Sequence, residues 1–256
     1  MFKTIVITGP TGYLGSAIVT RLLKNFNVIG ISRTASSFRF DISPDGALLG
    51  QYIPLDLDLS SISDSDLVSL IDDCALASGA PLVGLVNNAF TSYPRTALSI
   101  DRDTVHSTAE SLLGVHVRLS LAISEFFKVG VGGSIVNVAS MYGKVSPRPC
   151  LYSTPDSVNP ILYGALKAGL MQASRYLSSL LAPSNIRVNT VSYGPFPSLD
   201  VQKSDPEFIQ RLAQQTHLRR IGFPKEAAGV IAFLLSEDSS YITGADIPVD
   251  GGWTAW

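Results

Sequence analysis

The chain has 256 residues, 46% hydrophobic and 16% charged, which allows a substantial core in one large α/β domain or two small ones. Its 19 basic and 21 acidic residues give a net charge of −2, which argues against nucleic acid as the main partner, because a phosphate backbone requires a basic surface. Cys74 and Cys150 are the only cysteines, so no disulfide framework is expected and a reducing compartment fits. No apolar run is long enough to span a membrane, and a strand begins directly at the amino end without a signal peptide. We therefore expect a soluble cytoplasmic protein with no membrane partner.

Apolar segments alternate with helical ones along the whole chain. The expected strands are residues 4–8, 27–32, 52–57, 82–87, 134–139, 186–192 and 246–250. The expected helices are residues 13–24, 63–77, 103–128, 160–181, 205–215 and 225–236, with a polar irregular segment at 34–50 and a proline-rich loop up to residue 160. The strands are β-branched and apolar on both faces, as in a parallel sheet covered by helices on both sides. We therefore expect an α/β fold, a doubly wound parallel sheet in a single Rossmann-like domain over residues 1–256.

A glycine-rich loop follows the first strand. Gly9, Gly12 and Gly15 are spaced three apart, immediately before a helix. The first glycine allows a tight turn, the second lets a pyrophosphate approach the backbone, and the third lets helix and strand pack closely. The start of the helix offers free N–H groups to the phosphate. Dinucleotide binding is predicted for the residues Gly9, Thr11, Gly12, Tyr13, Leu14 and Gly15.

The end of the second strand distinguishes between the two nicotinamide cofactors. An acidic residue there would bind the adenosine ribose hydroxyls and favour NAD. This chain instead has Ser32 and Arg33, and a guanidinium can bind a 2′-phosphate with two hydrogen bonds. The sequence therefore favours NADP(H), with NAD(H) as the alternative.

Tyr163 and Lys167 are four residues apart in the predicted helix 160–181, so their side chains share one face. A phenol has an ordinary pKa of about 10, and a nearby cation lowers it by favouring the phenolate. We therefore expect Lys167 to make Tyr163 usable as a general acid or base. Ser140 follows the fifth strand, where open α/β sheets bind their ligands, and its hydroxyl could stabilise a developing negative charge.

With these residues in place, the chain resembles the short-chain dehydrogenase/reductase family over almost its whole length. The matching motifs, in chain order, are residues 8–15, Asp56, Asn87-Asn88-Ala89, Ser140, Tyr163 with Lys167, residues 186–189, and residues 241–244 with 250–252. The resemblance implies a Rossmann-like sheet and an NAD(P)-dependent oxidoreductase.

The family's residue roles come to this chain as implications of that resemblance. Tyr163 would exchange the proton with the substrate oxygen, Lys167 would also hold the nicotinamide ribose, and Ser140 would hydrogen-bond the substrate carbonyl. The remaining implied cofactor contacts are Asp56 and Leu57 at the adenine, Asn88 and Ala89 along the cofactor channel, and Gly194, Pro195 and Phe196 near the nicotinamide.

The chain departs from the family pattern at several positions. Phe90 stands where a glycine usually completes the Asn-Asn-Ala-Gly motif, and Tyr193 stands where a proline usually precedes Gly194. The glycine spacing resembles the extended branch of the family, but the chain is too short for that branch's substrate domain. No asparagine lies between Asn88 and Asn137, although many relatives use one there for a water-linked proton relay; Ser111 falls at the corresponding place and has only a hydroxyl.

A metal site is not expected. The histidines His106, His116 and His217 are scattered among helical stretches without a cysteine or carboxylate cluster at ligand spacing, so we interpret them as surface or packing residues.

Three functions remain open on the sequence. The first is an NADP(H)-dependent carbonyl reductase or alcohol dehydrogenase acting on a small molecule, the second a nucleotide-sugar epimerase or dehydratase, and the third a non-catalytic dinucleotide-binding module. The polar segment between Ser140 and Tyr163 either contacts a hydroxylated, sugar-like substrate or is a rigid structural loop.

A homodimer or homotetramer is expected from the resemblance. The helices containing Ser111 and Tyr163 usually pack against partner subunits in the family. The first of them has more apolar residues than a solvated helix needs, namely Leu112, Leu113, Val115, Val117 and Leu119.

Overall fold

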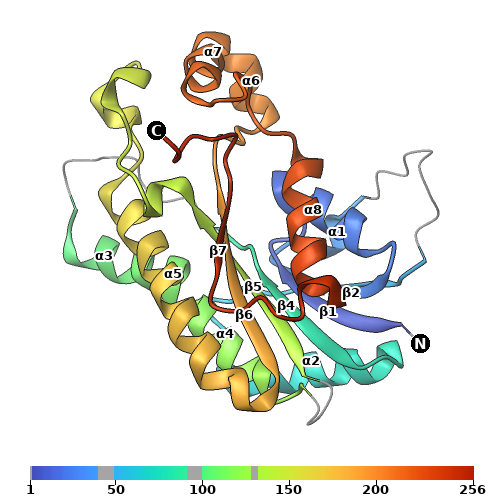
Figure 1. Cartoon of the computed structure of the whole chain (residues 1–256). Coiled ribbons are helices and arrows are strands. Elements are labelled where there is room, and N and C mark those ends of the chain that lie inside the picture. Colours follow the sequence, from blue (N-terminus) through green and yellow to red (C-terminus); the bar gives the residue numbers. More distant parts are fainter. Residues whose placement is uncertain (1, 40–48, 91–99, 128–131) are drawn as a thin grey trace.

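The computed structural model describes residues 2–39, 49–90, 100–127 and 132–256, and its strands form one seven-stranded parallel sheet (Figure 1). The strand order is β3-β2-β1-β4-β5-β6-β7. The strands are β1 Lys3–Thr8, β2 Phe26–Ser32, β3 Tyr52–Asp56, β4 Leu82–Asn87, β5 Gly133–Ser140, β6 Ile186–Tyr193 and β7 Asp246–Val249. The chain order reverses between β1 and β4, which creates the crevice where ligands bind in such sheets.

Helices cover both faces of this sheet. The α-helices are α1 Tyr13–Leu22, α2 Asp64–Ser78, α3 Arg102–Ala109, α4 Val115–Ser124, α5 Ile161–Leu181, α6 Leu199–Ser204, α7 Pro206–Gln215 and α8 Pro224–Leu235. Successive residues of a strand point to opposite faces. Accordingly, Ile5 and Ile7 of β1 pack in a core with α1 and α8, while Val6 packs in a second core with α2, α4 and α5. The predicted doubly wound α/β fold is confirmed.

The predicted helix 103–128 is interrupted. The structure has α3, then a π-helical turn from Glu110 to Gly114, then α4, which ends at Ser124. Residue 128 lies outside the described residues. A side chain at residue 114 would come within 2.2 Å of the Glu110 carboxylate, which folds over this turn to bind Arg118 at 2.6 Å. The apolar periodicity does not reveal the break, because it runs on through both helices.

Helix α6 was not predicted. It has only six residues, too few for an apolar period, and begins where the Ser198 hydroxyl accepts the N–H of Val201. Figure 1 shows α6 and α7 above the carboxyl end of β6, at the edge of the sheet where the strand-to-helix loops gather. In the part of the chain that the structure describes, no helix is both long and apolar enough to cross a membrane.

Candidate functional site

A cavity of about 720 Å³ lies along the carboxyl edge of the sheet. It is lined by residues from the ends of six strands and the loops after them, from the turn between α3 and α4, and from α5, and most of these residues are predicted as site residues by the sequence. The predicted residues that line it are Gly9, Thr11, Gly12, Tyr13, Leu14, Gly15, Ser32, Arg33, Leu57, Asn88, Ala89, Ser111, Ser140, Tyr163, Lys167, Gly194 and Phe196. The structure therefore brings residues from eight separate segments to one elongated cleft.

The glycine loop fits a dinucleotide pyrophosphate. Gly9 has a φ of +66°, a left-handed conformation that favours glycine, and a side chain at Gly15 would approach the Gly9 carbonyl oxygen to 2.0 Å. Helix α1 consequently starts close to the turn, and Gly12 caps it without a side-chain hydrogen bond. The first N–H groups of α1 are thus left to the cleft, where they can bind an anion.

Asn88 ties β4 to this loop. Its amide Nδ2 donates to the carbonyl oxygens of Thr8 at 3.1 Å and Gly9 at 3.0 Å, while the backbone N–H groups of Asn88 and Ala89 donate to the Thr8 hydroxyl at 3.0 and 2.8 Å. These four bonds fix the turn that is predicted to face a pyrophosphate. Asn88 therefore shapes the cleft as well as lining it.

Two predicted cofactor residues lie outside the lining of this cleft. The Asp56 carboxylate, at the last position of β3, accepts the backbone N–H of Ser36 at 2.8 Å and also binds the Ser36 hydroxyl, and these bonds lower its pKa. Pro195 lines the two neighbouring cavities instead. Of the two aspartates at the end of β3 and just beyond it, the one that lines the cleft is Asp58, whose pKa is lowered mainly by Ser60 and also by the charge of Arg33.

The sequence contained the signal for Asp58. Asp56-Leu57 and Asp58-Leu59 are equivalent aspartate–leucine pairs two residues apart, and ligands of open sheets bind beyond the strand ends. Because β3 ends at Asp56, the second pair reaches the cleft.

Lys167 is buried on α5 at 3% exposure, and its ammonium donates to the carbonyl oxygen of Val138 at 2.8 Å. Burial lowers its pKa to about 8. The ammonium lies 6.0 Å from the centre of the Tyr163 ring. Residues four apart on one helix therefore converge as predicted.

The pKa of Tyr163 differs in direction from the expectation. Burial raises it, more than the hydrogen bond with the Ser140 side chain lowers it. The charge of Lys167 does not offset this burial; its ammonium donates to Val138. Tyr163 is thus a protonated phenol beside a serine hydroxyl, an arrangement suited to donating a proton.

Ser111 lies in the π-helical turn, and its hydroxyl donates to the Thr108 carbonyl oxygen at 3.2 Å. It lines the same cleft as Lys167. π-Helical turns often occur at functional sites. Ser111 therefore lies at the cleft, and its role in a proton relay stays a prediction.

His116 is almost fully buried, and no role beyond packing was predicted for it. Its Nδ1 lies 3.0 Å from the Leu112 carbonyl oxygen and its Nε2 3.2 Å from that of Ala89. Burial, followed by the charge of Lys167, lowers its pKa to about 4, so the ring is neutral. It links the π-helical turn to the loop after β4. Among the described residues, no group of three or more His, Cys, Asp or Glu side chains could hold a metal ion.

A second cavity, of about 530 Å³, adjoins the cleft at Ser140 and Tyr163. Its walls come from the segment between Ser140 and Tyr163 and from α6 and α7, including Tyr142, Tyr152 and Phe208. The Gln202 amide on α6 donates to the Tyr13 hydroxyl at 3.1 Å and to the Pro197 carbonyl oxygen at 2.9 Å. The first of these bonds joins α6 to the first turn of α1, directly after the glycine loop.

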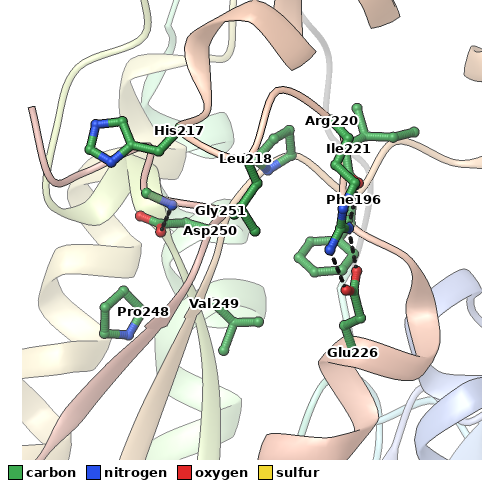
Figure 2. A pocket seen from close by; sticks show the side chains of 13 residues that line it. Phe196, His217, Leu218, Arg220, Ile221, Glu226, Pro248, Val249, Asp250 and Gly251 are labelled. Atoms are coloured by element: carbon green, nitrogen blue, oxygen red, sulfur yellow. Dashed lines mark hydrogen bonds and ion pairs between the residues drawn. The ribbon is translucent and has the colours of Figure 1, made fainter.

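A third cavity, of about 420 Å³, lies beside β7 (Figure 2). Its charged groups are already partnered: Arg220 binds both carboxylate oxygens of Glu226 at 2.8 and 2.7 Å, and Asp250 accepts the Gly252 N–H at 2.9 Å. Neither Ser140 nor Tyr163 lines it. This third cavity therefore contains none of the predicted catalytic residues, which line the other two.

Comparison with known proteins agrees with this geometry. Residues 49–254 match the family model described as enoyl-(acyl carrier protein) reductase. The chain is 30% identical to 7alpha-hydroxysteroid dehydrogenase of Bacteroides fragilis, over 98% of this chain and 94% of that protein.

Two solved structures are similar over almost their whole length. A short chain dehydrogenase from Leptospira borgpetersenii serovar Hardjo-bovis with bound NAD+ is 25% identical, with a TM-score of 0.81 over 99% of this chain and 93% of that one. YwfH, an NADPH-dependent reductase involved in bacilysin biosynthesis, is 25% identical, with a TM-score of 0.82 over 99% and 97%. This chain belongs to the short-chain dehydrogenase/reductase family of NAD(P)-dependent oxidoreductases.

Proposed function

We propose that this protein is a carbonyl reductase or alcohol dehydrogenase that interconverts a ketone or aldehyde and an alcohol, with Tyr163 as the general acid of the reduction. The observation that carries the proposal is the junction of the two large cavities at Ser140 and Tyr163, with Lys167 buried beside them. A substrate carbonyl in the 530 Å³ cavity and a nicotinamide in the 720 Å³ cleft would meet there.

The residues divide the work of the reaction. The cofactor supplies or accepts the hydride. Ser140 donates a hydrogen bond to the substrate oxygen and orients it, and Tyr163 delivers the proton that completes the hydroxyl group. In the oxidation, Tyr163 takes that proton back. Lys167 is held by Val138 at 2.8 Å, where it can bind the nicotinamide ribose and keep the site positive as the phenol loses its proton.

NADP(H) is the proposed cofactor. Arg33 is exposed at the end of β2 and lines the cleft next to Ser32, where a 2′-phosphate would meet a guanidinium. Asp58 lies close enough to Arg33 for that charge to lower the carboxyl pKa, so it can hold the guanidinium in place. The related structures include both a complex with NAD+ and an NADPH-dependent reductase.

The substrate is proposed to be a hydroxylated or sugar-like carbonyl compound. Tyr152, Asn159, Ser153 and Ser157 of the segment between Ser140 and Tyr163 line the second cavity, so this segment forms a wall of the site. The relatives' names do not assign one substrate, since they include a hydroxysteroid dehydrogenase and a 3-oxoacyl-[acyl-carrier-protein] reductase.

A homodimer or homotetramer is also proposed, on different residues from those expected. Of the five apolar residues expected to form the interface, Leu112, Val115 and Leu119 are buried within the chain itself. The exposed large apolar residues of α4 and α5 are Leu121 at 40%, Ile161 at 68%, Tyr176 at 71% and Leu180 at 52%. A monomeric mass in light scattering at micromolar concentration would contradict this assembly.

The activity test uses purified protein, NADPH and a panel of ketones and hydroxyketones. We expect a substrate-dependent loss of the absorbance of the reduced nicotinamide. Tight co-purification of a cofactor without turnover of any carbonyl compound would instead support the nucleotide-sugar enzyme or the non-catalytic binding module.

A further inference from the structure

Tyr152 is held rigidly in the wall of the second cavity. Its ring packs against Phe208 of α7 with ring centres 5.3 Å apart. The carbonyl oxygen of the preceding Leu151 accepts the Arg211 Nε at 2.8 Å. Side chain and backbone are thus anchored to the same helix, which fixes the position of the Tyr152 hydroxyl.

The hydrogen bonds of this hydroxyl show which way its proton points. The oxygens of Tyr142 and Tyr152 are 2.8 Å apart, so one hydroxyl donates to the other. The Asn159 amide also donates to the Tyr152 oxygen, at a long 3.5 Å. Tyr142 is only 8% exposed, and within the described chain its oxygen has no hydrogen-bond partner apart from Tyr152.

A buried hydroxyl that donates to nothing is costly. If Tyr152 donated to Tyr142, the Tyr142 proton would be buried without an acceptor. If Tyr142 donates to Tyr152, the buried Tyr142 proton has an acceptor, and the Tyr152 proton is left at the half-buried surface of the cavity. The second arrangement leaves no buried donor unpaired, and it presents an O–H donor to the cavity contents.

We propose that the Tyr152 hydroxyl is a specificity-determining donor that binds a second oxygen atom of the substrate, apart from the carbonyl oxygen held by Ser140 and Tyr163. This inference rests on the proposed carbonyl reduction and extends it. It assigns Tyr152, in the segment between Ser140 and Tyr163, to the recognition of one oxygen atom of the substrate.

The charges of the cavity narrow the substrate class further. Among the described residues that line it, none is a lysine or an arginine, and the carboxylate present, Asp205, accepts the Phe208 N–H at 2.9 Å. The nearby Arg211 and Arg148 are engaged by Leu151 and Gln215. A phosphate or carboxylate on the substrate would therefore lack a cationic partner here. The matching substrate is an uncharged carbonyl compound that carries at least one further hydroxyl or carbonyl oxygen.

The test compares Tyr152→Phe with the wild type on matched uncharged ketones. The probes are cyclohexanone and its 2-, 3- and 4-hydroxy derivatives, with kcat and KM measured for each with NADPH. Tyr241→Phe is the matched control, because it makes the same chemical change at a fully exposed residue. Tyr142→Phe is the second variant, since it removes the proposed donor to Tyr152 and leaves the Tyr152 proton in place.

We expect the wild type to favour at least one hydroxyketone over cyclohexanone in kcat/KM. In Tyr152→Phe, the ratio of kcat/KM for that hydroxyketone to kcat/KM for cyclohexanone should fall by roughly 3- to 10-fold, the value of one hydrogen bond. Tyr142→Phe and Tyr241→Phe should retain the preference. Equal effects of Tyr152→Phe on all four ketones, or loss of the preference in Tyr142→Phe but not in Tyr152→Phe, would overturn the inference.

A binding measurement separates this inference from the proposed function. If none of the ketones turns over, carbonyl reduction fails, and calorimetric titration of cyclohexanol and cyclohexane-1,2-, 1,3- and 1,4-diol into the protein with NADP+ decides the role of Tyr152. A preference for a diol that disappears in Tyr152→Phe supports the donor. Equal binding of cyclohexanol and all three diols by the wild type overturns it.

Discussion

The cofactor cleft and the substrate cavity meet at Tyr163 but are built from different kinds of contact. In the cleft, side chains fasten to backbone atoms of the sheet: Asn88 to Thr8 and Gly9, and Lys167 to Val138. In the cavity, side chains of irregular segments contact each other, as in the hydrogen bond of Tyr142 with Tyr152 and the packing of Tyr152 on Phe208. The cleft is therefore fixed by the fold itself, whereas the cavity is set by individual side chains that can change without altering the sheet.

Tyr163→Phe tests the point where the two regions meet, and we expect the largest effect there. The variant keeps the ring but loses the exchangeable proton, so turnover at saturating cofactor and substrate should fall by roughly 10²- to 10⁴-fold. Cofactor affinity, measured by fluorescence titration with NADPH, should remain at the wild-type value. Near-full turnover would show that the proton comes from elsewhere.

The pH dependence of the wild type adds a second measurement at Tyr163. Because burial raises the pKa of this phenol, it stays protonated through neutral pH. Reduction should then show no loss from ionisation of Tyr163 below pH 10, while oxidation, which needs the phenolate, should rise with pH over the same interval. A reduction rate that falls with an apparent pKa near 7, absent in Tyr163→Phe, would contradict this assignment.

Lys167→Met tests whether one residue of the cleft serves both cofactor binding and the reaction. The variant should lose both turnover and NADPH affinity. In wild type, burial lowers the Lys167 pKa from 10.5 to about 8, so between these values the unfolded chain binds more protons than the folded one. The free energy of unfolding of cofactor-free wild type should therefore rise relative to the variant from pH 8 to pH 10.5, by up to about 3 kcal/mol.

Chemical denaturation of both proteins across this pH range measures the difference. A constant difference would mean that Lys167 is not desolvated. Loss of turnover with unchanged NADPH affinity would mean that Lys167 serves the reaction but does not bind the cofactor.

Arg33→Ala tests the far end of the cleft, where the effect should be confined to one cofactor. Losing hydrogen bonds to a charged group should weaken NADPH binding by roughly 10- to 100-fold and leave NADH almost unchanged. Arg39→Ala is the matched control, because Arg39 binds the carbonyl oxygens of Ser36 and Phe38 instead of lining the cleft. Equal losses for both cofactors would refute the 2′-phosphate assignment.

Ser111→Ala is expected to have the smallest effect, a few-fold loss of turnover, because one hydroxyl in the π-helical turn replaces an amide. Ser107→Ala is its control, since the Ser107 hydroxyl also binds helix carbonyl oxygens, of Asp103 and Thr104, but is exposed and away from the cleft. Identical turnover in both variants would show that Ser111 has no part in a proton relay.

The contrast between the cleft, which the fold fixes, and the cavity, which individual side chains shape, explains what the sequence could and could not predict. The strands, the glycine loop and the Tyr163–Lys167 pair follow from periodicity and spacing, because backbone geometry determines where they lie. The choice between Asp56 and Asp58 depended on the residue at which β3 ends, which periodicity resolves only to within a residue or two.

The cavity could not be derived in this way. The pairing of Tyr142 with Tyr152 and the packing of Tyr152 on Phe208 join segments without any regular pattern. The direction of the Tyr163 pKa shift was missed for a similar reason: it depends on burial and on the orientation of one ammonium group, which spacing along a helix does not show.

The hydrogen bond from Gln202 to the Tyr13 hydroxyl connects residues that are 189 positions apart, one on α6 and one in the first turn of α1. Tyr13 also lines the cleft, so a displacement of α6 away from the glycine loop has to break this contact. A single neutral hydrogen bond contributes only about 1 kcal/mol, so it fastens α6 without locking it. The position of α6 can therefore adjust with little cost in free energy.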